Sequence, residues 1–441
     1  MTEQQILDLG PALADYLEPF QFCCDYTQTF RHLGVYCRGL LSDLQRKTAE
    51  PIALASGTAV RTLQLFLTQH GWDYGRLRQQ FHQRIVTVLP TVADDGTGTV
   101  GIIDESGHAK KGDKTPGVQR QYCGELGKKE NCIVTVHLAV ARERYKTLLD
   151  ADLFLPRCWD EDRPRCQQAG IPDDLHHRTK WQIALSQYER AVANGLRFDW
   201  LTFDEGYGAA GEFLAGLGQQ RYVGEVPCSW WCFARSAGAE HPSRADDLVR
   251  YSPLFNQQPW RTIDLARQTL GEQVWKYKAA RVWASCGSQP RAESCWLIWV
   301  VNEQTGEEKY FVSNAAEDAR VELLIQVAFR RWNVEHALRL GKQEIGLKHF
   351  EGQDYTALLR HLTLCVVMMG FVAEQAVRLR GEKSGGDGGA GVFGSQRGVA
   401  VVAGAVARHE RSGLQVAGAA VSAETQSGGS AVPAETGCWF A

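Results

Sequence analysis

The 441-residue sequence has little net charge, because 48 Lys and Arg residues stand against 51 Asp and Glu residues and leave a formal balance of −3. This excludes a uniformly basic nucleic-acid-binding protein, although contact with phosphates needs only one basic face. Between Arg31 and Arg84, eight basic residues outnumber three acidic ones, so that this segment carries +5. Both a DNA-binding face and an ordinary solvated helical surface are compatible with that local excess.

The sequence also lacks patterns typical of a zinc site, a secretory signal or a membrane span. The 13 cysteines include no C-x-x-C pair and no histidine spacing typical of zinc, which indicates small buried groups in a reducing compartment. The polar segment Met1–Leu9 has no apolar core of the kind that a secretory signal requires. The longest apolar run, 362–373, is too short to span a membrane, and we predict that it is a core helix. We therefore expect a cytoplasmic protein without a membrane partner.

The chain has enough apolar residues, 44%, to build two or three packed units. Apolar residues recur at helical spacing within residues 1–95, and Pro90 with the Gly-rich run 94–98 marks a boundary. Beyond it we predict strands at 99–103, 132–140, 146–154 and 200–203. A helix is predicted at 180–194, with Gly195 as its C-cap. This succession of strands and helix predicts an α/β sheet.

The second half of the chain contains three segments with different sequence patterns. Residues 221–314 are β-rich, with strands predicted at 221–226, 273–284, 295–301 and 309–312. A helix predicted from residue 317 carries Glu335, and an apolar helix follows at 357–374. The tail at 381–441 contains 14 Gly, 12 Ala and a single Leu, so we expect disorder. A shifted reading frame in GC-rich DNA would produce the same composition.

Two aspartates follow apolar strands in the same way. Asp104 comes after Ile102-Ile103 and Asp204 comes after Thr202-Phe203, and each is followed by Glu. An acid at the end of a buried strand is costly unless it is paired or bound to a cation. Two such acids on neighbouring strands would repel each other, and a divalent metal ion between them would relieve the repulsion. The alternative is that both aspartates only begin turns.

The third acid is Glu335, within the pattern Arg331-x3-Glu335-x6-Lys342. At 3.6 residues per turn these three side chains fall within roughly 40° of one another around a helix. A carboxylate that binds metal beside cations that hold phosphates suits phosphodiester chemistry. A solvated helix with ordinary ion pairs is the alternative.

Together these segments resemble the DDE transposases of bacterial insertion sequences, in the group with a Y-R-E-K signature around the third acid. The resemblance covers about residues 15 to 378. It rests on 103–107 with 110–112, 120–124 with 131–132, 203–208, the Arg331–Lys342 pattern, and 346–352. The tyrosine of the signature would fall at Ala328, which is a departure from the family.

The resemblance implies a ribonuclease-H-like core, formed by 96–220 and 315–380 and interrupted by the β-rich insertion 221–314. It also implies a helical N-terminal domain, 1–95, that binds DNA ends. Asp104, Asp204 and Glu335 would hold two Mg²⁺ ions about 3.5–4 Å apart, and Mn²⁺ could substitute.

The resemblance also implies residues that contact DNA. Arg331 and Lys342 would bind phosphates of the transposon end, and loop residues His108, Lys110 and Lys111 could do so too. An aromatic residue of the insertion would stack on a flipped base, which is worth roughly 1–3 kcal/mol. The candidates are Trp230, Trp231 and Trp260, for which packing in the sheet is the alternative. Lys180 and Tyr207 match the family but are predicted to be structural.

The implied function is that of a cut-and-paste transposase. It would cleave double-stranded DNA at terminal inverted repeats, join the element to target DNA, and work as a dimer on DNA in the bacterial nucleoid. Two other functions stay open: a catalytically decayed or domesticated DNA-binding protein, and a nuclease that performs no strand transfer.

Overall fold

The computed structural model describes residues 8–235, 241–267 and 271–381. The predicted Gly/Ala-rich tail therefore lies outside the described residues from position 382 onward. The chain before Val100 is helical, as the sequence predicted. Its elements are α2 (Leu9–Leu17), η1 (Glu18–Cys23), α3 (Thr27–Leu41), α4 (Ala49–Ser56), α5 (Val60–Thr68), α6 (Tyr74–Val88) and η2 (Leu89–Thr91).

A mixed sheet forms the centre of the protein. Its first strands are β1 (Val100–Ala109), β2 (Gln119–Cys123), β3 (Lys128–Arg142) and β4 (Tyr145–Leu153), followed by β5 (Trp200–Phe203) and β6 (Tyr222–Val226). β3 pairs antiparallel with β1, β2 and β4, whereas β5 is parallel to both β1 and β6. The order β4-β3-β1-β5-β6 agrees with a ribonuclease-H-like core. The predicted hairpin at 132–154 is confirmed, and β2 was not predicted.

Short helices connect the strands of this sheet. They are α7 (Arg157–Asp160), α8 (Arg163–Gln168), α9 (Lys180–Ala193), α10 (Glu205–Gly208) and α11 (Gly211–Gly216). The start of α9 is stabilised by a capping box, in which Thr179 and Gln182 each bind the other's backbone N–H. Its end is close to the predicted position, since Asn194 caps the helix and Gly195 follows with a φ of 100°.

The β-rich region extends the central sheet. It contains β7 (Trp231–Phe233), β8 (Ser243–Arg244), α12 (Ala245–Tyr251), α13 (Pro253–Asn256), β9 (Arg261–Arg267), β10 (Gly271–Cys286), β11 (Gln289–Pro290), β12 (Cys295–Asn302) and β13 (Glu308–Ser313). β13 pairs with β6, and β12 and β10 follow, so the ladder is continuous. β6, the first strand of the predicted insertion 221–314, pairs directly with core strand β5.

The single helix predicted from residue 317 is wrong. The chain forms α14 (Val321–Phe329), α15 (Trp332–Leu340) and the π-helical turn η3 (Gly341–Ile345). The break at residues 330–331 lets Phe329 and Trp332 pack edge to face, with ring centroids 4.4 Å apart. Both rings also contact Trp275 of β10, at 4.8 and 6.5 Å. Tertiary packing of these aromatic rings thus overrides the helical periodicity.

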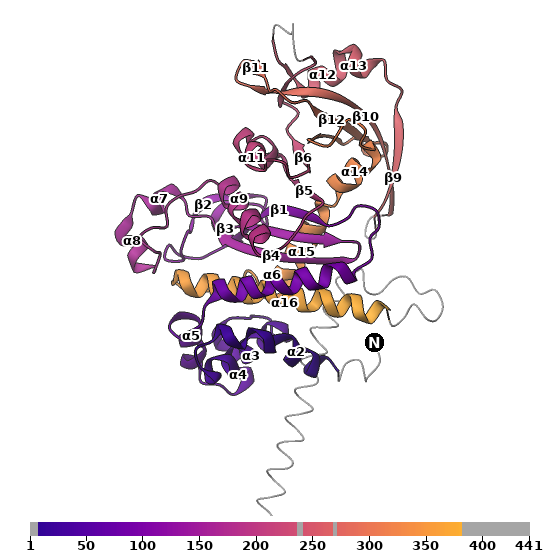
Figure 1. Ribbon diagram of the computed structural model, residues 1–441. Helices are drawn as coiled ribbons and strands as arrows, with labels where there is room; N and C mark the ends of the chain where they lie inside the picture. The colour runs from indigo at the N-terminus through magenta and orange to yellow at the C-terminus, as the bar shows by residue number, and fades with distance from the viewer. Residues whose placement is uncertain (1–7, 236–240, 268–270, 382–441) are drawn as a thin grey trace, which may run out of the picture.

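The last helix, α16 (Tyr355–Gly381), confirms the prediction of an apolar core helix. It is long and apolar enough to cross a membrane, but 94% of its most apolar window is buried inside the protein. Figure 1 shows α16 and α6 side by side beneath the sheet, with α2–α5 beyond them. Tyr16 donates a hydrogen bond to the Val367 carbonyl at 2.9 Å, and Arg84 binds Glu374 through two nitrogens. The N-terminal helices and the sheet therefore pack around one shared helix.

Candidate active site

The two predicted aspartates lie side by side at the centre of the sheet. Ile103 of β1 is paired in parallel register with Phe203 of β5. The next residues along the two strands, Asp104 and Asp204, are therefore neighbours as well. Asp104 does not end its strand, because β1 continues to Ala109 against β3. The expectation that both acids close a strand is therefore correct for Asp204 and wrong for Asp104. Their adjacency does not depend on that detail.

Asp104 is a buried carboxyl group, with only 8% of the residue exposed. Burial raises its pKa to about 7, and the negative charges of Asp204 and Glu335 act in the same direction. The Arg331 guanidinium and a 2.7 Å hydrogen bond from the Glu105 amide oppose that rise. The raised pKa of Asp104 thus results chiefly from burial, with a smaller contribution from the neighbouring acids.

Asp204 is held by the chain that follows it. Its side chain caps α10 by accepting hydrogen bonds from the backbone N–H groups of Gly206 and Tyr207, at 3.0 and 3.3 Å. Tyr207 itself is buried, and its hydroxyl has no hydrogen-bond partner among the described residues. The neighbouring Glu105 forms an ion pair with Lys180 at 2.6 Å. This contact is consistent with the structural role predicted for Lys180.

Glu335 lies near the aspartates, with Arg331 between them. The same Arg331 nitrogen, Nη1, is 3.0 Å from Glu335 and 3.8 Å from Asp104. The two carboxylate oxygens are therefore no farther apart than the sum of those distances, 6.8 Å. The Glu335 side chain is 53% exposed, which leaves it freer to move than the two aspartates. The ion pair between Arg331 and Glu335 is the contact expected under the alternative interpretation of this segment, and it forms despite the break in the helix.

The three acids suit a divalent cation in their chemistry, although they do not yet enclose one. Carboxylate oxygens are the ligands that Mg²⁺ prefers, and the burial of Asp104 beside Asp204 disfavours a negative charge that a bound cation would stabilise. Across 8–235, 241–267 and 271–381, however, no group of three or more His, Cys, Asp or Glu side chains is close enough to hold a metal ion. Arg331 supplies the positive charge in this arrangement. The exposed side chain of Glu335 is the least confined of the three acids.

Glu225 is a fourth acid that the sequence analysis missed. Gly224 of β6 pairs in parallel with Phe203 of β5, so Glu225 lies beside Asp204 in the same row as Asp104. Its carboxylate is 3.6 Å from Arg331 Nη2 and 2.7 Å from Lys309 Nζ. No sequence motif marks Glu225, because its position becomes evident only from the register of β5 with β6.

The predicted DNA-binding cations lie in different surroundings. Lys342 lies in the π-helical turn, where its charge acts on the buried pair His108 and His137. The ammonium group of Lys110 donates to the carbonyls of Lys348 and Phe350, and burial lowers its pKa to about 8. Lys111 is exposed. His108 is buried and bonds Thr135 at 2.9 Å, which corrects its predicted place on a loop.

The candidate stacking tryptophans also differ in exposure. Trp231 is 52% exposed and Trp260 is 39% exposed, whereas Trp230 is partly buried against the core. Trp260 has the most basic surroundings, with Lys276 Nζ 5.0 Å and Lys278 Nζ 4.9 Å from its ring centroid. A partly exposed ring that lies beside two cations is suited to contact with a nucleotide.

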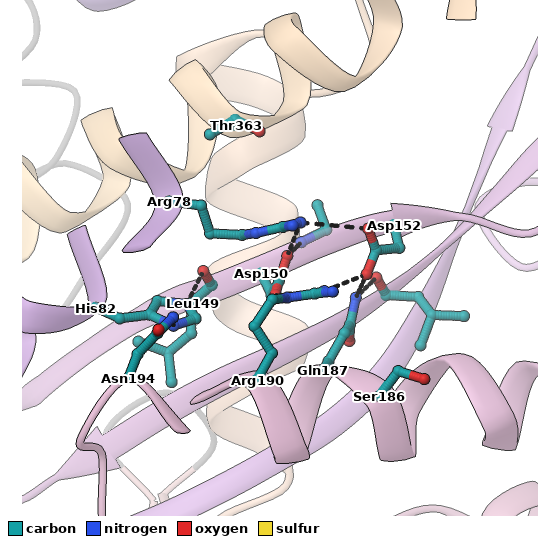
Figure 2. Close-up of polar contacts among 12 residues, drawn as sticks. Arg78, His82, Leu149, Asp150, Asp152, Ser186, Gln187, Arg190, Asn194 and Thr363 are labelled. Carbon is teal, nitrogen blue, oxygen red and sulfur yellow. Dashed lines mark hydrogen bonds and ion pairs between the residues drawn. The ribbon is translucent and has the colours of Figure 1, made fainter. Parts of the chain in front are cut away.

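Part of the basic charge between residues 31 and 84 is used inside the protein. Lys47 is buried and donates to the Leu40 carbonyl at 2.8 Å, and Arg84 binds Glu374. Arg78 of α6 belongs to a ring of four charged groups. Arg78 binds both Asp150 and Asp152, and Arg190 of α9 binds the same two acids (Figure 2). The local excess of +5 therefore overstates the charge that this region can offer to DNA.

Two comparisons bear on the identity of this fold and site. The sequence model of a family described as DDE superfamily endonuclease matches residues 19–282. A probable transposase for insertion sequence element IS701 from Microchaete diplosiphon is 35% identical over 187 residues. The aligned part is 42% of this chain and 44% of that protein, so the match spans less than half the length of this relative.

Proposed function

The chain belongs to the DDE superfamily of endonucleases, and from this premise we propose that it is the transposase of an insertion sequence. In this proposal it cleaves DNA at the ends of the element and joins them to a target by a cut-and-paste route. The observation that supports it is the proximity of three acids that are far apart in the sequence: Asp204 lies beside Asp104 on the paired strands, and Arg331 contacts both Asp104 and Glu335. The similarity to the IS701 protein supports the same proposal.

In the proposed reaction, Asp104 and Asp204 provide a fixed pair of carboxylates and Glu335 closes on them. Bound Mg²⁺ ions, or Mn²⁺ in their place, would supply a water of lowered pKa and would stabilise the leaving oxygen. Asp104 would bind such an ion as the ionised carboxylate, the form that burial disfavours in the absence of a cation. Asp204 needs no rearrangement, since its hydrogen bonds from Gly206 and Tyr207 already orient it.

The proposed DNA contacts begin beside the acids, at Arg331. Arg331 and Lys342 would hold phosphates of the terminal repeat, and the exposed Lys111 would extend this surface, whereas Lys110 would have to leave its backbone carbonyl partners to join it. Trp260 is the preferred stacking residue because of its basic surroundings, with Trp231 and Trp230 as the other candidates. Two copies of the chain would bring two ends together. The work would take place on DNA in the bacterial cytoplasm.

The test is cleavage of a duplex that carries the inverted repeats found beside the gene. Asp104→Asn, Asp204→Asn and Glu335→Gln should each abolish Mg²⁺-dependent cutting and leave DNA binding in place. Glu205→Gln is the matched control, because Glu205 adjoins Asp204 but is exposed to solvent. Retained cleavage in one of the three variants would reject the role of that residue.

A second function, DNA binding without catalysis, is favoured by one observation. Ala328 replaces the tyrosine of the family signature, and it is buried in α14. A domesticated or decayed protein would bind the repeats but would not cut them in Mg²⁺ or Mn²⁺. A substrate with a pre-cut 3′-OH end separates a transposase from a nuclease that performs no strand transfer.

A further inference from the structure

The acid row contains more carboxylates than the proposed chemistry requires. Asp104, Asp204 and Glu225 follow paired positions on β1, β5 and β6, so three acids lie next to one another across three parallel strands. Glu335 adds a fourth from α15. Among them, Glu225 is held by Lys309, whose ammonium group is 2.7 Å from Glu225 Oε1. Both side chains are only 14% exposed, so this ion pair is largely buried.

Arg331 uses its two terminal nitrogens for two different sets of acids. Nη1 faces Asp104 and Glu335, at 3.8 and 3.0 Å. Nη2 faces the Oε2 atom of Glu225 at 3.6 Å, while Lys309 takes the Oε1 atom. The Arg331 side chain is only 15% exposed, so the guanidinium group cannot exchange its carboxylates for bulk water without moving. A half-buried cation that loses its partners is strongly disfavoured.

These contacts indicate what would happen to Arg331 if Asp104 and Glu335 bound a divalent cation. Arg331 Nη1 then loses both of its acidic partners, whereas Nη2 keeps Glu225. Resting on the function proposed above, we propose that Glu225 is a positioning residue: it holds Arg331 when the metal ligands release it. Lys309 fixes Glu225 for this purpose by binding one of its two oxygens. The released edge of the guanidinium is then free to receive a phosphate oxygen.

The test is a double-mutant cycle between Glu225→Gln and Arg331→Gln, read by calorimetric titration of the DNA-free protein with Mn²⁺. With Arg331 present, Glu225→Gln should weaken Mn²⁺ binding by about 10-fold, since metal loading then leaves the guanidinium without a carboxylate. In the Arg331→Gln background the same change should alter the affinity by less than about 2-fold. Glu205→Gln is the control for loss of a nearby negative charge and should leave the affinity unchanged.

Equal weakening of Mn²⁺ binding in both backgrounds would overturn the proposal, because Glu225 would then act directly on the metal. No weakening in either background would overturn it too. If Glu225→Gln fails to fold, Glu225→Asp keeps the charge but withdraws the carboxylate by one methylene, and the same cycle applies. The proposed function is judged separately, by cleavage with the wild-type protein: intact cutting without coupling between the two residues rejects the positioning role alone.

Discussion

The ionisation of Asp104 should make the metal-free protein less stable as the pH rises. The pKa of this carboxyl group moves from 3.8 to about 7 on folding, chiefly because burial disfavours its charge. One pKa unit corresponds to about 1.4 kcal/mol, so the ionised Asp104 costs about 4 kcal/mol of folding free energy. Below pH 4 the group is protonated in both states and the cost is absent. It grows as the pH rises and is complete above pH 7, and about 3 kcal/mol of it falls between pH 5 and pH 8.

Asp104→Asn should remove this dependence. Asparagine carries no charge, and its side-chain oxygen can still accept the hydrogen bond from the Glu105 amide. At pH 8 without metal, the variant should therefore be more stable than the wild type by up to about 4 kcal/mol, although it is expected to be inactive. At pH 5 the difference should be much smaller.

Urea unfolding of both proteins at pH 5 and pH 8, with and without Mg²⁺, measures this effect. Mg²⁺ should stabilise the wild type at pH 8 and leave the variant unchanged, because only the wild type has the full set of carboxylates. Asp204→Asn is the matched comparison, since it removes a carboxylate that already caps α10. The reasoning is refuted if Asp104→Asn is less stable than the wild type at pH 8, or if the difference between them does not change with pH.

Three other predictions follow from the surroundings of single side chains. Asp150→Asn should lower the free energy of unfolding in urea by about 3–5 kcal/mol, because it leaves Arg78 and Arg190 with one buried acid fewer. The control is Glu351→Gln, in an exposed ion pair, which should lower it by less than about 1 kcal/mol. Equal losses of stability in the two variants would contradict the role of the buried ring. Tyr207→Phe should raise the unfolding free energy by about 1 kcal/mol, since the buried hydroxyl has no partner among the described residues, and a loss of stability would indicate an unseen hydrogen bond. Trp260→Ala should weaken binding of DNA with an unpaired base by roughly 1–3 kcal/mol, whereas Tyr251→Ala, at another exposed aromatic residue, should have no effect in the same anisotropy titration.

The two aspartates could be proposed as site residues from the sequence because the pattern that marks them is local. An apolar run that ends in an acid indicates where a buried strand delivers a carboxylate, and parallel strands then bring two such groups together. The pairing of Arg331 with Glu335, which was the alternative to a metal and phosphate site, is also a local feature, because residues four apart on a helix are neighbours. These features did not depend on the exact bounds of the elements.

Other features of the site depend on contacts between distant segments. Glu225 joins the acids because β6 pairs with β5 in one particular register, and no pattern around residue 225 carries that information. The helix breaks before Trp332 because aromatic rings of β10 and α14 pack there. The segment around Lys110 has the composition of a DNA-binding loop, but the Lys110 ammonium group donates to backbone carbonyls more than 200 positions away in the sequence.

The uninterrupted ladder from β1 through β6 and β13 to β10 has a mechanical consequence. Trp260, beside β9, and the acids of β1 and β5 belong to one hydrogen-bonded framework without a hinge between them. The distance between the ring that would stack on a base and the carboxylates that would cut is then fixed by the pairing of the intervening strands, which lie about 4.8 Å apart. A change of register between β6 and β13 would therefore shift Trp260 relative to the acids, whereas a longer loop at the tip of the sheet would not.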